Sequence, residues 1–243
     1  MSEKTSPDTV PGLGFKDKEK AFETLKLLEG RDPDYQRLAI KGLIGRAKRT
    51  LTLTKAEDKL QNIKDAMEVF DKWLQNFEDM NLGKENKAYL PLPSIKVLSS
   101  LFKKYDVQDK LAKEFLEAYK KVGGEYKHLR TVSSGENEPT WDIVRNSQLK
   151  NILKDIEENK PDMWDDGLPT EEHLRLIAWA YSPEASHIKK NLSKMEEKLK
   201  GDDSMDDEGS EEEESPKKNS SKRKSSSGSE SSEEETPKKK SKK

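Results

Sequence analysis

The stretch that decides the fold is residues 54–77, TKAEDKLQNIKDAMEVFDKWLQNF. Its large apolar residues recur every three or four positions, which places them on one face of a helix. Thr54 followed by Glu57 predicts a capping box at the start of this helix. The stripe covers only about three heptads, which favours the core of a helical bundle over a coiled-coil dimer. The stripe consists of Leu60, Ile63, Met67, Phe70, Leu74 and Phe77.

Helices are also predicted on both sides of this segment. Before it, we expect one helix over residues 16–29, with Phe22 on its apolar face, and a second that starts with Asp32 as N-cap and Pro33. Gly42 and Gly45 of the second helix would allow a neighbouring helix to approach closely. Apolar spacing predicts further helices up to Leu199, and no stretch alternates with period two for long enough to predict a strand. The expected fold class is all-α, a multi-helix, bundle-like body.

Composition divides the 243 residues into three parts. Residues 1–14 form a leader rich in polar residues, Pro and Gly, which we expect to be disordered. Residues 15–200 form the helical body, either as one domain or as two sub-bundles over 15–80 and 92–200. Residues 201–243 contain a single hydrophobic residue and are expected to be a disordered tail, because such a segment cannot build a packed core.

The tail alternates acidic and basic blocks. The basic blocks resemble nuclear import signals, which predicts a nuclear protein with an import receptor as a partner; the alternative is a nonspecific basic tail. Ser210 and Ser232 precede acidic residues and are candidates for phosphorylation, which would weaken contact with DNA. The candidate import residues are Lys217, Lys218, Lys222, Arg223, Lys224, Lys238, Lys239 and Lys240.

Several classes of function are disfavoured by what the chain lacks. Cysteine is absent, which excludes disulfides, thiolate catalysis and cysteine zinc sites. No apolar run reaches the length of a membrane span, so we expect no membrane partner. There is no phosphate-binding glycine loop or metalloprotease motif, and the three histidines are dispersed, so neither a metal nor a cofactor is expected. The oligomeric state is left open.

Two basic segments are candidates for a nucleic-acid surface. Residues 16–49 hold ten Lys and Arg against six acids, and residues 119–130 combine basic residues with aromatics around a Gly-Gly break. The alternative for each is a solvated helix face. Arg46 falls on an apolar face, where it is expected to meet an acidic partner or a phosphate. The candidate DNA-binding residues are Lys16, Lys18, Lys41, Arg46, Lys48, Arg49, Lys120, Lys121, Lys127 and Arg130.

Several short motifs occur together over residues 14–199. They are GFKDKEKA at 14–21, LEGRD at 28–32 followed by Tyr35 and Gln36, RAKR at 46–49, YKHLRT at 126–131, WDI at 141–143 with Arg145, and WAYSP at 179–183. In this order they resemble the motifs of the insect uracil-DNA degrading factor family. The resemblance implies binding and cleavage of uracil-containing DNA. That family can carry two copies of its first motif, and this chain has one, which implies weaker DNA binding.

Catalytic residues do not follow from the resemblance. Tyr126 and His128 are weak candidates for proton transfer, and Trp141 and Trp179 are candidates for stacking on a flipped base; the alternative for both tryptophans is a place in the core. Two other functions stay open. One is a noncatalytic nuclear module that binds DNA or chromatin, and the other is a helical scaffold that pairs through the stripes over residues 60–77 and 185–199.

Overall fold

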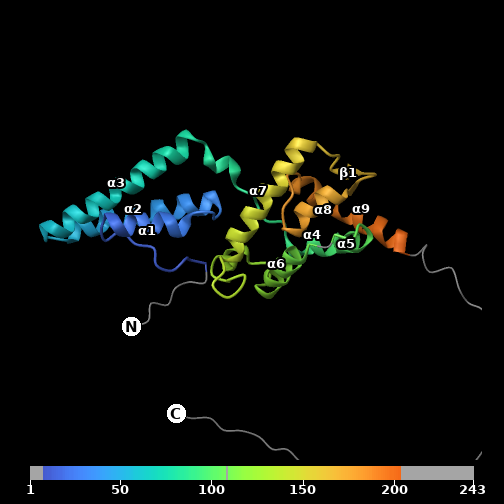
Figure 1. Ribbon diagram of the computed structural model, residues 1–243, viewed down its shortest axis with the longest axis horizontal. Helices are drawn as coiled ribbons and strands as arrows, with labels where there is room; N and C mark the ends of the chain where they lie inside the picture. The colour runs from blue at the N-terminus through green and yellow to red at the C-terminus, as the bar shows by residue number, and fades with distance from the viewer. Residues whose placement is uncertain (1–7, 108, 204–243) are drawn as a thin grey trace, which may run out of the picture. The chain divides into compact units, whose positions relative to one another are not determined.

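The computed structural model describes residues 8–107 and 109–203. Most of these residues lie in helices, and the only sheet formed by the described residues has two short strands (Figure 1). The prediction of an all-α fold is confirmed. Helix α9 (Ala185–Asp203) extends slightly past the predicted end of the body at residue 200. The rest of the predicted tail lies outside the described residues.

Helices α1, α2 and α3 share one hydrophobic cluster. Both α1 and α2 contact α3, which contributes Ala66 and Phe70 to that cluster, and Figure 1 shows the three helices side by side. Asp17 caps the start of α1 by accepting a hydrogen bond from the Lys20 N–H, and Pro33 occupies the first turn of α2. The bounds are α1 (Lys18–Leu28), α2 (Pro33–Leu53) and α3 (Glu57–Asp79).

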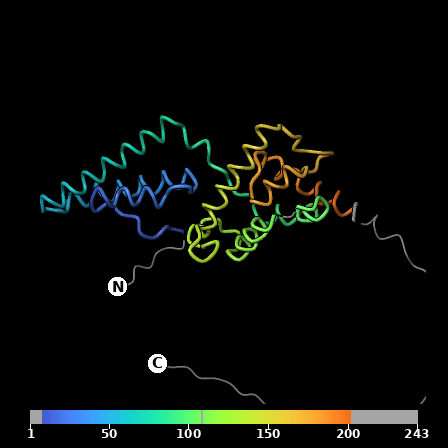
Figure 2. Tube along the Cα trace, in the orientation of Figure 1, coloured from blue at the N-terminus to red at the C-terminus, as the bar shows by residue number. Residues whose placement is uncertain are grey.

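The remaining elements build a second, larger hydrophobic cluster. Phe115 is fully buried in it, with its ring centroid 5.2 Å from that of Trp179 and 6.0 Å from that of Trp141. Figure 2 follows the chain from α3 into this part through the segment before α4. The further bounds are η1 (Leu82–Glu85), α4 (Leu92–Val97), α5 (Ser99–Lys104), α6 (Lys110–Lys121), η2 (Tyr126–Arg130), α7 (Trp141–Asn159) and α8 (Glu171–Ala178).

A short antiparallel hairpin joins α7 to α8. Strands β1 (Trp164–Asp165) and β2 (Leu168–Pro169) pair across a turn in which Asp166 and Gly167 both have positive φ. This backbone conformation favours Asp-Gly in a two-residue hairpin turn. The sequence predicts a turn here but no strand, because strands of two residues are too short to show an alternating pattern.

Three local predictions about the first helices are wrong. The capping box is absent, because Thr54 ends α2 and Ala56 holds the position before α3. Phe22, expected inside, is 53% exposed, since it lines a surface hollow beside Val69 and Trp73 of α3 instead of packing in the core. No neighbouring atom lies within 4 Å of where a Cβ would sit on Gly42 or Gly45, so neither glycine serves a close helix contact.

Part of the leader is ordered. Val10 is buried, and its N–H donates a hydrogen bond of 2.9 Å to the hydroxyl of Tyr35. Gly14 exchanges two hydrogen bonds with the Thr24 hydroxyl, at 2.9 and 3.0 Å. The prediction of disorder up to residue 14 is therefore wrong for residues 8–14, because one apolar side chain and these polar contacts hold the segment.

His173 is fully buried between the hairpin and the start of α9. Its Nδ1 lies 3.0 Å from the Met163 carbonyl, which can only accept, so Nδ1 carries the proton. Nε2 lies 2.8 Å from the Ser182 hydroxyl and accepts from it. Burial lowers the pKa of His173, although the hydrogen bond to Met163 opposes the shift.

We predict that His173 makes stability fall as the pH falls below about 6.5. The unfolded chain takes up the proton near that pH, whereas the folded chain resists it until a lower pH, so protonation favours unfolding in between. The urea midpoint should decrease from pH 7 to pH 5.5, and His173→Gln should flatten this decrease. The exposed His187 is the matched control, and an equal flattening by His187→Gln would contradict the assignment.

Candidate nucleic-acid interface

A buried ion pair joins the first helices to α7. Arg31 donates through Nη1 to both carboxylate oxygens of Asp142, at 2.8 and 3.1 Å, and the two side chains are 7% and 1% exposed. Arg31 also donates to the carbonyls of Leu27 and Arg130. Its Nε and Nη1 are thus directed to groups inside the protein, and the sequence gives no sign of this because Asp142 lies 111 positions away.

Arg130 is a second buried arginine, and the prediction that it binds DNA is corrected here. Its side chain is 8% exposed, and its guanidinium lies 3.8 Å from the ring centroid of Tyr35. Nη1 donates to the carbonyl of Asp8 at 3.3 Å. A cation over an aromatic face in the interior contributes to folding. It is not available to a phosphate in this structure.

Arg145 is fully buried and acts as a clamp on backbone carbonyls. Its Nε donates to Trp179 at 2.8 Å, and its Nη2 donates to Ala180 at 3.2 Å. On the other side it donates to the carbonyls of Lys87 at 3.1 Å and Ala88 at 3.4 Å. The clamp therefore holds the chain before α4 and the chain after α8 against α7.

Asp32 lies next to this clamp, and the pKa of its carboxyl is raised. Its carboxyl accepts a hydrogen bond of 3.3 Å from the side-chain amide of Asn146. Burial raises the pKa of Asp32, although Arg145 and the Asn146 hydrogen bond oppose the shift. Asn146 also donates to the Gly30 carbonyl at 3.0 Å. Asp32, Asn146 and the three arginines together tie the motifs of the sequence to one another.

A cleft of about 800 Å³ opens beside these buried groups. Residues from the start of α2, the end of α3, η1 and α7 line it. Three lysines give it cationic character, and two acids partly offset them, so the cleft suits an anionic ligand. Its polar lining includes Lys87, Lys150, Lys154, Glu85, Glu157, Gln36, Asn146 and Asn151, and its apolar lining includes Phe77.

Lys87 differs from the other two lysines of the cleft. Its side chain is half-buried, while Lys150 and Lys154 are exposed. Burial lowers the pKa of Lys87, and the charges of Arg145 and Lys150 act in the same direction, against Glu85 and Asp32. The sequence predicts no role for any of these lysines. The spacing of four between Lys150 and Lys154 was the one available signal, since it places both on one side of α7.

The structure leaves most of the predicted basic residues on the surface. Arg46 is exposed rather than partly buried. Lys41 forms an ion pair of 3.6 Å with Glu78, and Lys120 forms one of 2.7 Å with Glu117. The other exposed members of the predicted set are Lys16, Lys18, Lys48, Arg49, Lys121 and Lys127.

The predicted catalytic and stacking residues do not form one site. Trp141 and Trp179 are 4% and 0% exposed, so they belong to the core and offer no ring face to a base. Tyr126 is 36% exposed and stacks on Tyr89, with ring centroids 4.8 Å apart. His128 is half-buried, and its Nε2 lies 3.1 Å from a carboxylate oxygen of Asp8.

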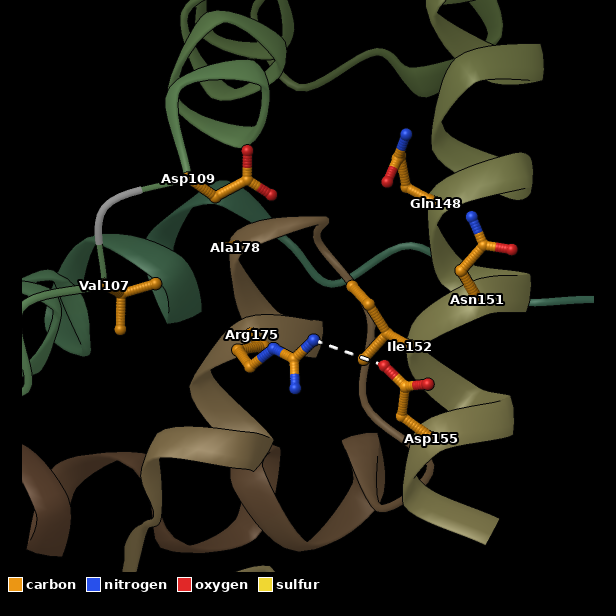
Figure 3. A pocket seen from close by; sticks show the side chains of 8 residues that line it. All are labelled: Val107, Asp109, Gln148, Asn151, Ile152, Asp155, Arg175 and Ala178. Carbon is orange, nitrogen blue, oxygen red and sulfur yellow. Dashed lines mark ion pairs between the residues drawn. The ribbon is translucent and has the colours of Figure 1, made fainter. Parts of the chain in front are cut away.

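A smaller hollow of about 150 Å³ lies between α7 and α8 (Figure 3). Figure 3 shows Arg175 of α8 directed at Asp155 of α7, and their charged groups lie 3.5 Å apart. Asp109, also on its wall, already accepts hydrogen bonds from the Ala112 N–H and the Trp179 indole. The charged groups of this hollow already have partners inside the protein, so the larger cleft is the better candidate site.

Comparison with protein-family models, curated proteins and solved structures finds no match to this chain. Within the described ranges, no helix has the length and apolar character needed to cross a membrane. In the same residues, no three His, Asp or Glu side chains gather as a metal site would require. The predicted import residues, from Lys217 to Lys240, and the phosphorylation candidates Ser210 and Ser232 lie outside the described residues.

Proposed function

We propose that this protein binds uracil-containing DNA and cleaves it in the nucleus. The observation that carries the proposal is the cleft, which brings three lysines and three side-chain amides together beside the motif residues. Lysines neutralise phosphates, and amides can hydrogen-bond the edge of a base that has left the helical stack. The proposed preference for uracil rests on the motifs that resemble those of the uracil-DNA degrading factor family.

In the proposal, the exposed cations near the end of α2 make a second contact with DNA, about 15–20 Å along the helix from the cleft. Arg46, Lys48 and Arg49 are solvent-exposed, so they are free to approach a phosphate backbone. Contacts of this kind position DNA without reading its sequence. The proposal thus assigns DNA affinity to α2 and recognition of the base to the cleft. The basic tail would serve as the import signal.

A noncatalytic DNA- or chromatin-binding module is the second candidate. The observation that favours it is the burial of the motif residues themselves. Arg31, Arg130 and Arg145 contact carbonyls, a carboxylate or aromatic rings inside the protein. The role of these motif residues in the fold is enough to explain their contacts. The two candidates differ in whether DNA is cut.

The deciding experiment treats two plasmids, one with uracil in place of some thymine and one without, with the purified full chain. Faster nicking of the uracil plasmid supports the first candidate, and binding without nicking supports the second. Equal nicking of both plasmids overturns the proposed preference. The assay is repeated with EDTA, because nicking that survives EDTA does not need a dissociable metal ion.

We predict that Arg46→Ala, Lys48→Ala and Arg49→Ala together weaken DNA binding and reduce its salt dependence. The slope of log affinity against log salt should decrease by about 0.9 for each phosphate contact that is lost. Fluorescence anisotropy over a salt series measures this slope. The control removes three exposed lysines of α9, Lys189, Lys190 and Lys194. If the control variant changes the slope as much as the α2 variant, the interface lies elsewhere.

A further inference from the structure

The backbone of Lys87 is held by a fully buried arginine, Arg145. Arg145 donates to its carbonyl and to that of Ala88, and the Lys87 Nζ donates to the carbonyl of Glu85 at 3.0 Å. The lysine therefore starts from a backbone held against α7, and its side chain lines the cleft. Such positioning lowers the entropy that a reacting group loses when a substrate binds.

The surroundings of Lys87 also lower the pKa of its amine, which increases the share of the neutral, nucleophilic form. Burial is the main cause of its lowered pKa; Arg145 and Lys150 add to the shift, and Glu85 and Asp32 oppose it. A desolvated lysine beside other cations is the usual form of an amine that attacks a carbonyl carbon. Lys150 and Lys154 are exposed on α7, where they can contact the flanking phosphates, although Lys154 also lies 3.8 Å from a carboxylate oxygen of Glu158.

We propose that Lys87 is a nucleophile that attacks C1′ of a deoxyribose held in the cleft and cuts DNA at abasic sites. The inference rests on the proposed binding of DNA and deepens it with a reaction. A cleft of about 800 Å³ lies within the size range of small-ligand sites and can admit one extruded nucleotide. Asn151 also lines this cleft, and an amide there could hydrogen-bond a base that is still attached.

The reaction balances without a metal, an oxidant or a reductant. The Nζ lone pair forms a bond to the C1′ aldehyde carbon of the open abasic sugar, and water leaves to give an iminium. A proton leaves C2′ to solvent, a double bond forms between C2′ and C3′, and the bond from C3′ to oxygen breaks. The downstream strand departs with a 5′ phosphate. Water then hydrolyses the iminium, which returns the amine and an unsaturated aldehyde on the upstream strand.

Deoxyuridine can enter the same sequence. Nζ displaces uracil from C1′, and uracil leaves with the electron pair of the glycosidic bond and takes up a proton. The sugar ring then opens as the bond from C1′ to the ring oxygen breaks, and that oxygen is protonated. This yields the same iminium, so removal of uracil and strand cleavage would share one lysine.

The test incubates the full chain with a labelled duplex that contains one abasic site, in the presence of sodium borohydride. Borohydride reduces an iminium to a stable amine, so a covalent protein–DNA adduct is expected, with Lys87 as the modified residue in peptide mapping. Lys87→Gln and Lys87→Arg should both lose that adduct. Lys84→Gln, on η1 but outside the cleft lining, should keep it.

Mapping of the wild-type adduct keeps the test decisive even if a Lys87 variant folds poorly. An adduct on another lysine, including those of residues 217–243, overturns the inference, and so does the absence of any adduct. Binding to uracil-DNA is measured separately by anisotropy. Preserved uracil preference without a Lys87 adduct refutes only the lysine reaction, whereas a Lys87 adduct without uracil preference refutes only the choice of uracil.

Discussion

Asp142→Asn is expected to lower the free energy of unfolding by about 3–5 kcal/mol, because it leaves the buried Arg31 without its counter-charge. Both side chains are almost completely buried, so solvent cannot replace the lost partner. In a chain of this size such a loss corresponds to a decrease in Tm on the order of 10 °C. Urea unfolding followed by circular dichroism measures the change.

A double-mutant cycle and a neighbouring acid provide the controls. Arg31→Met combined with Asp142→Leu removes both charges and should be more stable than Asp142→Asn alone, since no unpaired charge stays buried. Additive effects of the single changes Arg31→Met and Asp142→Leu would contradict the coupling.

Asp32→Asn should leave Tm unchanged or raise it. The raised pKa of Asp32 means that the native state disfavours its charged form, so stability falls as pH rises through the folded pKa.

Arg145→Met should destabilise the fold by about 1–3 kcal/mol for the buried Trp179 carbonyl left unsatisfied, with a smaller loss from the part-buried carbonyls of Lys87 and Ala88. The carbonyls that lose their donor are those of Lys87, Ala88 and Trp179, while that of Ala180 keeps the Leu90 N–H. Arg145→Lys should recover only part of the loss, because an ammonium cannot present the planar set of donors.

The matched control for Arg145 is Arg175 on α8, which is largely exposed beside Asp155. Arg175→Met should change the free energy of unfolding by less than about 1 kcal/mol, as is usual for a surface ion pair. Urea unfolding of both variants under one condition gives the comparison. Equal effects of the two changes would mean that the carbonyl contacts of Arg145 contribute little.

Periodicity in the sequence was sufficient for the fold class and for individual helices. Ile63 and Phe70 of the α3 stripe are buried as predicted, because a helix of that length must cover its apolar face. The same reasoning failed for Phe22, which is 53% exposed. Spacing shows that a face is apolar, but not whether another helix lies against it.

The candidate site was less accessible to sequence reasoning. Arg130 lies in a basic and aromatic segment of the kind that contacts DNA. Only the fold shows that it faces Tyr35, which is 95 positions earlier in the chain. Lys87 follows a short 3-10 helix, in a segment where apolar residues show no periodic spacing. Its surroundings come from α7 and from the end of α8, and local patterns contain no information about such distant partners.

The separation between buried arginines and cleft lysines has a consequence for how relatives of this chain diverge. Arg31, Arg130 and Arg145 are constrained by folding, so a descendant that changed its chemistry would still have to keep them. Lys87, Lys150 and Lys154 carry no comparable folding constraint, since two of them are exposed and the third is only half-buried. If the proposed function holds, drift at these three positions would remove the proposed activity and leave the architecture intact. The lysines, rather than the motifs, are therefore the positions at which inherited activity should be judged.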